Sequence, residues 1–380
     1  MKRFVSTALA FALTLTMGVT ALRAENIKVG AILAVTGGQS FLGAPEAKTL
    51  EMMVAEKNAA GGINGNKIDL LIKDSAGDPE KAISFAKQLI EEEKVFAIIG
   101  PSSSGETMKI KDIAEQGKTI LLSCAAAEVI VNPVAKYVFK TPQKDSFAVQ
   151  MIFKEMNKMK ISKIAVVADN TGFGKAGKEQ LEKIAPDFGI QILAGEVYDK
   201  AATDLSALVA KLMSDKEIQA VINWSVVPAQ AIVAKNMRQA GWQVPLFQSH
   251  GFGNIKYAQA AGAAAEGIIF PAGRLLVADT LAANHPQKSL LAKYKKDYES
   301  KYQEDVSTFG GHAYDALAIL VEGIRLAGPD REKVRDTIEN LKGFAGTGGI
   351  FNFSPEDHNG LAIDAFEMLT VKDGKFVMYQ

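Results

Sequence analysis

The chain has a single cysteine, Cys124, among its 380 residues, so no disulfide can form within it. This excludes a small secreted domain held together by disulfides, and a large hydrophobic core must supply the stability instead. Histidines are also few: His250, His285, His312 and His358 are scattered and have none of the spacings of a zinc site. We therefore expect no metal and no other cofactor.

The chain also lacks an excess of either charge, since it has 43 basic and 43 acidic residues. Such a balance argues against nucleic acid or an anionic membrane as the partner. Beyond the N-terminal stretch, no apolar run reaches the roughly 18 residues of a membrane-spanning helix.

The first 24 residues are typical of a signal peptide. Basic Lys2 and Arg3 precede the apolar run "FVSTALAFALTLTMGVTAL", and small residues follow. Cleavage after Ala24 or after Ala21 would fit, and we favour Ala24 because "ENIKVGAIL" then opens directly into a strand. The absence of a cysteine there argues against a lipid anchor. We expect a soluble protein exported to the periplasm.

The rest of the chain alternates apolar strand patterns with amphipathic helix patterns, and its length favours two domains. The rhythm runs once from "NIKVGAIL" to "TILLS" and again from "KIAVVAD" to "GIIFPA", which predicts two doubly wound α/β units with buried, mostly parallel sheets. Three helical segments and short antiparallel strands follow residue 275. We predict a two-lobed α/β fold with a ligand cleft between the lobes, beyond the carboxyl ends of the strands. The first lobe is predicted to comprise 25–142 and 272–350, and the second 143–271 and 351–380.

Residues 99–107, "IGPSSSGET", place three serines between a strand end and a helix start. The spacing of Gly100 and Gly105 does not match the G-x-S-x-G nucleophile elbow, and no Gly-Lys-Ser/Thr follows as in a phosphate loop. Hydroxyls and free N–H groups at a helix start suit a carboxylate. The alternative is an ordinary cluster of helix-capping residues.

A second motif, "GFGKAG" at 172–177, matches G-x-G-x-x-G, with Glu196 where a dinucleotide fold has its acidic residue. The preceding strand ends before Asp169, so the first glycine is not the tight turn directly after a strand. We therefore favour a helix-start loop that brings Phe173 into the cleft.

Two further residues end predicted strands on the cleft side. His250 in "QSHGFGN" could bind ligand or simply hold its loop, and Trp224 in "VINWSVVP" could form an apolar wall or pack in the core.

In order along the chain, "KVGAILAVTGGQSFLGAPEAKTLEMMVAEKNAAGGINGNKIDLLIKDSAGDPEKAISFAKQLI", "IIGPSSSGET", "DNTGFGKAG", "AAEGIIF" and "GGIFNFSPEDHNG" resemble the leucine/isoleucine/valine-binding family of periplasmic proteins. The resemblance covers essentially the whole mature chain. It implies the type I fold that serves ABC importers, and a binding function without catalysis. The serines are then expected to bind a carboxylate.

The resemblance also implies roles for individual residues of the first lobe. Ser104 matches the serine that binds the ligand carboxylate, Thr107 the threonine of the same helix start, and Ser103 lies beside them. In "SCAAA", Ala125 keeps a backbone carbonyl position, whereas Ala127 replaces a threonine and retains only its N–H.

The walls of the cleft follow in the same way. Phe41 and Leu42 match the wall that covers the ligand side chain, Val226 or Val227 the opposite wall, and Phe173 stands where amino-acid binders often have tyrosine. The largest departure is His250, which replaces the glutamate that pairs with the α-ammonium of amino acids.

Loss of that glutamate predicts a ligand with a carboxylate and no α-ammonium, because a buried ammonium without its partner is costly. Aromatic or branched organic acids fit, resting on Phe173, Trp224, Phe41 and the valines, with a hydrogen bond from His250 to an oxygen. An apolar amino acid bound in an altered way is the alternative.

We expect a monomer that closes on its ligand and presents it to the membrane permease of an ABC importer. A binding protein that presents ligand to a sensory receptor is a rival. An enzyme is the weaker rival, since the sequence offers no base near Ser104.

Overall fold

A computed structural model describes residues 26–380 of the chain. The predicted signal peptide and its cleavage site lie outside the described residues. Within 26–380, no helix is both long enough and apolar enough to cross a membrane.

The first lobe is built on a five-stranded parallel sheet of order β2-β1-β3-β4-β5. Its strands are β1 (Ile27–Leu33), β2 (Ile68–Asp74), β3 (Ala97–Ile99), β4 (Ile120–Ser123) and β5 (Val138–Lys140). Helices α1 (Ser40–Ala59), α2 (Pro79–Lys87) and α3 (Ser104–Gln116) connect them. Val29 lies level with Leu70 and Ala97 in neighbouring strands. Buried aliphatic side chains form a separate core on each face of this sheet, as expected for a parallel sheet.

The second lobe has a seven-stranded sheet of order β14-β13-β10-β9-β8-β6-β7. Its parallel strands are β6 (Lys163–Asp169), β7 (Gln191–Tyr198), β8 (Ala220–Trp224), β9 (Leu246–Gln248) and β10 (Ile269–Gly273). The antiparallel strands β13 (Phe366–Lys372) and β14 (Lys375–Met378) extend the sheet beyond β10. Their hairpin turns at Asp373 and Gly374, both at positive φ, as the sequence "KDGK" predicts.

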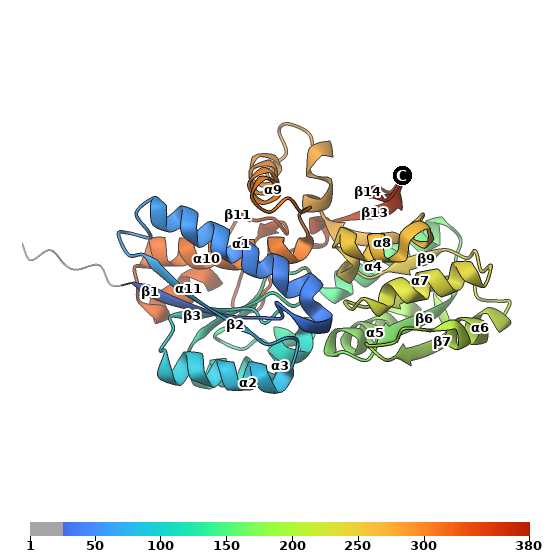
Figure 1. Ribbon diagram of the computed structural model, residues 1–380, viewed down its shortest axis with the longest axis horizontal. Helices are drawn as coiled ribbons and strands as arrows, with labels where there is room; N and C mark the ends of the chain where they lie inside the picture. Colours follow the sequence, from blue (N-terminus) through green and yellow to red (C-terminus); the bar gives the residue numbers. More distant parts are fainter. Residues whose placement is uncertain (1–25) are drawn as a thin grey trace, which may run out of the picture.

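The helices of the second lobe are α4 (Asp145–Lys158), α5 (Gly172–Ile184), α6 (Ser206–Ser214), α7 (Ala229–Gln239) and α8 (Ile255–Ala261). The alternation of strands and helices predicted from "KIAVVAD" to "GIIFPA" includes all of these helices except α4, which precedes it. The predicted two-lobed α/β fold is confirmed, and Figure 1 shows the lobes side by side along the long axis of the molecule.

After β10 the chain returns to the first lobe through α9 (Lys288–Tyr302), α10 (Thr308–Ala327) and α11 (Arg331–Glu339). In Figure 1 the orange helix α10 lies along the blue helix α1, and the two helices are in contact. The short strands β11 (Phe344–Ala345) and β12 (Ile350–Phe351) form a two-stranded ribbon.

One predicted boundary disagrees with the packing. Phe351, Phe353 and Leu361 are buried in the core of the first lobe, whereas Phe366 and Leu369 belong to the core of the second. Assigning 351–365 to the second lobe is therefore wrong, because the apolar side chains of this segment cover the first sheet. The remaining boundaries stay predictions.

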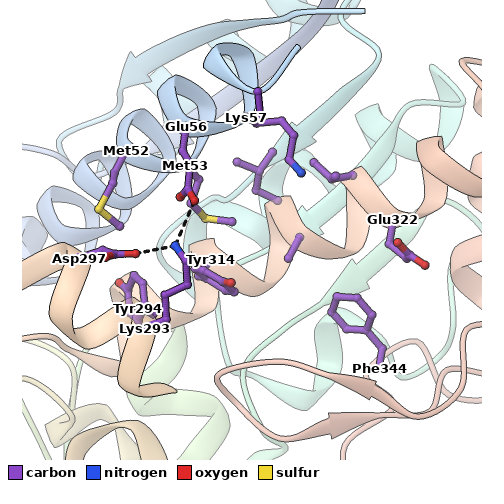
Figure 2. A pocket seen from close by; sticks show the side chains of 14 residues that line it. Met52, Met53, Glu56, Lys57, Lys293, Tyr294, Asp297, Tyr314, Glu322 and Phe344 are labelled. Atoms are coloured by element: carbon purple, nitrogen blue, oxygen red, sulfur yellow. Dashed lines mark hydrogen bonds and ion pairs between the residues drawn. The ribbon is translucent and has the colours of Figure 1, made fainter. Parts of the chain in front are cut away.

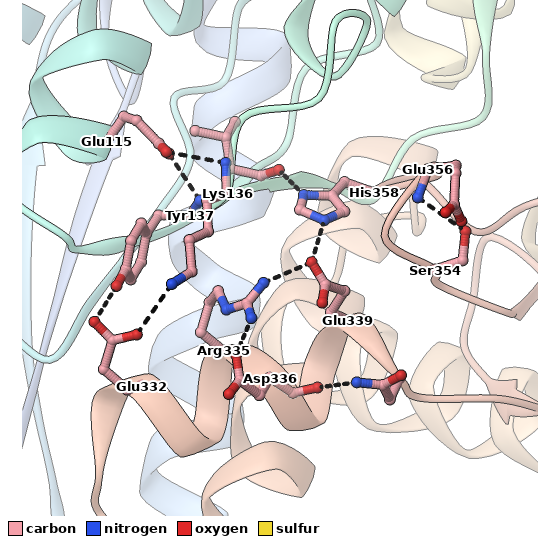
Figure 3. Close-up of polar contacts among 12 residues, drawn as sticks. Glu115, Lys136, Tyr137, Glu332, Arg335, Asp336, Glu339, Ser354, Glu356 and His358 are labelled. Carbon is pink, nitrogen blue, oxygen red and sulfur yellow. Dashed lines mark hydrogen bonds and ion pairs between the residues drawn. The ribbon is translucent and has the colours of Figure 1, made fainter.

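His358 helps to hold this segment against the first lobe. Its ring stacks on Phe139 with centroids 4.1 Å apart, its Nδ1 lies 2.8 Å from the carbonyl of Val138, and its Nε2 lies 3.2 Å from Glu339. Figure 3 shows the contact of His358 with Glu339, together with the pairing of Arg335 and Glu339 on α11. His358 is therefore a buried structural residue.

The two lobes meet at the N-termini of α3 and α5. A Cβ added to Gly172 would lie 2.8 Å from the Cα of Gly105 and 2.9 Å from its amide nitrogen. A substitution of Gly105 is easier to accommodate, since a Cβ there would have its nearest neighbour at 3.6 Å. The absence of a side chain at 172 is what lets the two helix starts approach this closely.

We predict that Gly172→Ala holds the lobes apart without weakening either lobe. Alanine favours a helix more than glycine does, so the midpoint of thermal unfolding should not fall. Small-angle X-ray scattering should give a larger radius of gyration than for the wild type. Gly105→Ala is the matched control, and an equal expansion in both variants, or in neither, would contradict this account.

Candidate functional site

The two sheets converge on one pocket between the lobes. Both have the strand order in which the first strand lies between the second and the third, and ligands in such sheets bind beyond the carboxyl ends of the strands at this reversal. The segments that follow β1, β3, β4, β5, β6, β8 and β9, together with the start of α10, all contribute to the pocket. Its lining residues are Leu42, Ser102, Ser103, Ser104, Cys124, Ala125, Ala126, Pro142, Phe173, Val226, His250, Gly251, Phe309 and His312.

The pocket is tightly closed, with a cavity volume of about 20 Å³. A single water molecule needs roughly 10–15 Å³ by this kind of measure. Any larger solute therefore requires the lobes to separate before it enters and to close around it in a wider arrangement.

A larger hollow, of about 290 Å³, lies between α1, α9 and α10. Figure 2 shows that Lys293 there bridges Glu56 and Asp297 at 3.0 and 2.6 Å. These charged groups pair with one another, so only its size suggests that this hollow is a binding site. The pocket between the lobes is the better candidate, because several buried polar atoms in and beside it have no hydrogen-bond partner.

The three serines have different roles. Ser102 accepts a hydrogen bond from the amide of Ala34 at 3.0 Å and donates to Glu46. Ser103 caps α3, since its hydroxyl accepts from the amide of Glu106 and donates to that residue's carboxyl group at 2.5 Å. The hydroxyl oxygen of Ser104 accepts from the amide of Ala127 at 3.2 Å, which leaves its own proton for a ligand.

Thr107 and the two predicted alanines mostly support the serine loop. Thr107 is buried, donates to the carbonyl of Ser103 at 3.0 Å and bonds to the hydroxyl of Ser123, and it does not line the pocket. Ala127 does not line it either, and its N–H is the one held by Ser104. Ala125 does line it, although its own N–H donates to Ser123.

Two acidic side chains lie directly behind the serines. Burial raises the pKa of Glu46 well above its usual range, and burial also raises the pKa of Glu106. A negative charge is therefore disfavoured on both. The first N–H groups of α3 and the positive end of its dipole then dominate the field at the serine loop.

Phe173 faces the serines from the second lobe. It follows the cap residue Thr171 at the start of α5, and its ring lies 5.7 Å from that of Trp224. Trp224 is fully buried and does not line the pocket, so it supports Phe173 from behind.

Close packing explains the three glycines of the G-x-G-x-x-G motif at the start of this helix. Gly172 allows the approach of the lobes, Gly174 sits on the carbonyl of Asp169, and a Cβ on Gly177 would meet the Trp224 ring at 1.9 Å.

Of the two residues expected to form the first-lobe wall, only Leu42 lines the pocket. Phe41 is half-buried and contacts the second lobe instead. Its ring lies edge-on to Tyr257 at 5.2 Å, and its carbonyl accepts a hydrogen bond from the Asn254 side chain at 2.9 Å. Phe41 is thus a contact between the lobes.

His250 and His312 are the only ionisable side chains besides the thiol of Cys124 that line the pocket. They are 6 % and 5 % exposed, and both line it within the described part of the chain. Burial, with Lys140 and His312 nearby, lowers the pKa of His250 well below its usual range. Burial and Lys140 lower the pKa of His312 to about 3. Both rings are therefore neutral near pH 7.

Sequence reasoning missed His312 in the pocket lining, and Lys140 and Asp145 behind it. His312 comes from α10, more than 60 positions after His250, and no local pattern links the two. Lys140 ends β5 and Asp145 begins α4, and both are fully buried. An alternation pattern that ends in Lys140 signals an ordinary strand end, so only the packing shows that these side chains lie next to the site.

A sequence profile of the periplasmic binding protein family matches residues 26–375. The chain belongs to this family. The leucine-, isoleucine-, valine-, threonine- and alanine-binding protein of Pseudomonas aeruginosa is 27% identical, over 83% of this chain and 82% of that one. Members of this class bind solutes.

Solved structures of related proteins have the same fold. An extracellular ligand-binding receptor from Rhodopseudomonas palustris HaA2 has a TM-score of 0.87 at 27% identity, covering 93% of this chain and 99% of that one. A solute binding protein of an ABC transporter from Rhodopseudomonas palustris BisB5, in complex with 3,4-dihydroxy benzoic acid, has a TM-score of 0.79 at 18% identity, covering 92% and 95%. The second likeness shows the shared fold alone.

We predict that Ser103→Ala lowers the free energy of unfolding by about 1 kcal/mol, because the α3 cap is lost. Urea unfolding followed by circular dichroism measures the change. Ser103→Thr, which keeps a capping hydroxyl, should recover most of it. Equal stability of the alanine variant and the wild type would show that Ser103 is not the effective cap.

Proposed function

We propose that this protein is the solute-binding component of an ABC importer and captures a small organic acid that has a carboxylate and no α-ammonium. One observation carries the proposal. The residues that line the pocket include the serine loop of a helix N-terminus but no aspartate, glutamate, lysine or arginine.

The serine loop suits the carboxylate end of such a ligand. The Ser104 hydroxyl and the N–H groups at the start of α3 can donate to it, and Ser103 holds that helix start in place. The raised pKa values of Glu46 and Glu106 reduce the repulsion that two ionised carboxylates behind the loop would exert.

The opposite wall does not suit an α-ammonium. In amino-acid binders of the resembling family a glutamate is expected where His250 stands here, and the depressed pKa of His250 keeps the ring neutral. A buried ammonium that lacks a charged partner leaves several kcal/mol of desolvation uncompensated. Each 1.4 kcal/mol is about tenfold in affinity, so an amino acid should bind far more weakly.

The body of the ligand would rest on apolar walls. Phe173 and Val226 come from the second lobe, and Leu42 and Phe309 face them. Aromatic and branched aliphatic acids present the matching surface. We infer that the ligand first docks on the serine loop and that the second lobe then closes over it, giving the form that a permease recognises.

The cellular setting is part of the proposal. The N-terminal stretch has the pattern of a signal peptide, and the family match supports export to the periplasm. We infer that the protein acts as a monomer and delivers its ligand to membrane permease subunits. Delivery to a sensory receptor remains the rival role for the same binding event.

An apolar amino acid is the second candidate ligand. The observation in its favour is the name of the Pseudomonas aeruginosa relative, which binds leucine, isoleucine, valine, threonine and alanine. In that case another group would have to do the work of the missing glutamate.

Matched pairs of ligands separate these two candidates. We expect 4-methylpentanoate to stabilise the protein more than leucine, and 3-phenylpropanoate more than phenylalanine, since each pair differs only in the α-ammonium. A ligand at 100 times its Kd adds about 2.7 kcal/mol of stability, which thermal-shift melts of refolded, ligand-free protein detect. Stabilisation by the amino acids alone would overturn the proposal.

We further predict that His250→Glu shifts the preference toward the amino acid of each pair, because the new carboxylate can pair with an ammonium. Titration calorimetry of both members measures the ratio of affinities. His285→Glu makes the same chemical change outside the pocket and should leave the ratio unaltered. An unchanged ratio in His250→Glu would mean that position 250 does not face the α-carbon of the ligand.

A further inference from the structure

A group of buried polar atoms at the His250 wall has no hydrogen-bond partner. It comprises both ring nitrogens of His250, Nδ1 of His312 and both carboxylate oxygens of Asp145. Buried polar groups are nearly always hydrogen-bonded, because leaving them unpaired costs free energy. Of these residues only His250, from η5 (His250–Phe252), and His312, from α10, line the pocket, so their ring nitrogens point to a polar partner on the ligand.

Asp145 lies directly behind His250. Its Oδ1 is 3.5 Å from Nε2 of the ring, and it is fully buried without lining the pocket. The nearby ammonium of Lys140 is committed elsewhere, since it donates to the carbonyls of Ala126, Pro142 and Gln143 at 2.8 to 3.0 Å. The backbone amide of Glu128 also lies near Asp145 and favours its ionised form, and the ring that faces the carboxyl group is that of His250.

Burial sets the protonation state of Asp145. It raises the pKa of Asp145 to about 8, while Lys140 opposes this shift and Glu128 adds to it, and burial lowers the pKa of Lys140 to about 8. Asp145 therefore holds its proton near pH 7 and can donate it to Nε2 of the neutral His250 ring, which faces it at 3.5 Å. A proton donated to Nε2 places the ring's own proton on Nδ1, which fixes the tautomer.

We propose that His250 and His312, with Asp145 positioning His250, form a subsite for a hydroxyl group on the part of the ligand remote from its carboxylate. This inference rests on the proposed function. A hydroxyl both donates and accepts, which matches two neutral imidazoles. A methyl group in the same place would leave the imidazole nitrogens unpaired.

The test compares hydroxyl and methyl groups of similar size on one skeleton. The probes are 3- and 4-hydroxybenzoate and 3- and 4-methylbenzoate, titrated calorimetrically into refolded, ligand-free protein. For the ring position that reaches the subsite, the hydroxy acid should bind about tenfold tighter or more than the methyl acid. Equal binding, or tighter binding of the methyl acid at both positions, would overturn the inference.

Variants test the positioning role of Asp145. In Asp145→Leu, which cannot donate to the ring, the ratio of hydroxy to methyl affinity should fall about tenfold, whereas a merely structural loss would lower both affinities together and leave the ratio unchanged. Asp357→Leu is the control, because Asp357 is a neighbouring acid paired with Lys144 at 3.0 Å. If Asp145→Leu does not fold, His312→Phe tests the subsite by the same ratio.

The failures of the two proposals are distinguishable. If 4-methylpentanoate or 3-phenylpropanoate binds and no benzoate shows a preference for the hydroxyl, the subsite is wrong and the proposed function stands. If only amino acids bind, the proposed function falls and the subsite falls with it.

Discussion

The backbone approach of α3 to α5 is the constraint on which the site depends. Each helix starts directly after a parallel strand of its own sheet, so each N-terminus points toward the other lobe. With no side chain at Gly105 or Gly172, the two starts come close enough for the serine loop and Phe173 to share one pocket. A side chain at 172 would hold these two helix starts apart, because packed lobes yield little to relieve the clash.

Carboxyl and ammonium side chains are kept out of the lining of that pocket and lie one layer behind it. Glu46 and Glu106 lie behind the serines, and Asp145 and Lys140 lie behind the histidines. The pocket therefore presents hydroxyls, N–H groups, neutral imidazoles and apolar walls. Specificity in such a site comes from hydrogen bonds that only the right ligand completes.

Much of the fold could be predicted from the sequence because parallel strands buried on both faces give continuous apolar runs, and helices between them give regular amphipathic patterns. Helix α4 was missed, and the last crossing between the lobes was placed too early. Phe351 and Phe353 read as an ordinary strand pattern, and nothing local to them tells which of two sheets they cover. Which sheet these residues cover depends on which sheet has a face that no other segment covers.

The site divides in the same way. The serine loop, Phe173 and His250 follow strand ends or begin helices, and local patterns mark both, so the sequence by itself placed these residues at a cleft. Leu42 was expected there from the family resemblance. Trp224 and Phe41 were expected in its lining and lie outside it, because the depth of a side chain depends on what packs over it. His312, Lys140 and Asp145 lie next to His250 only through the tertiary structure. The sequence determined the family pattern, the fold and the position of the serine loop, and the packing of distant segments decided which other groups line the pocket, since burial and pairing are properties of the assembled chain.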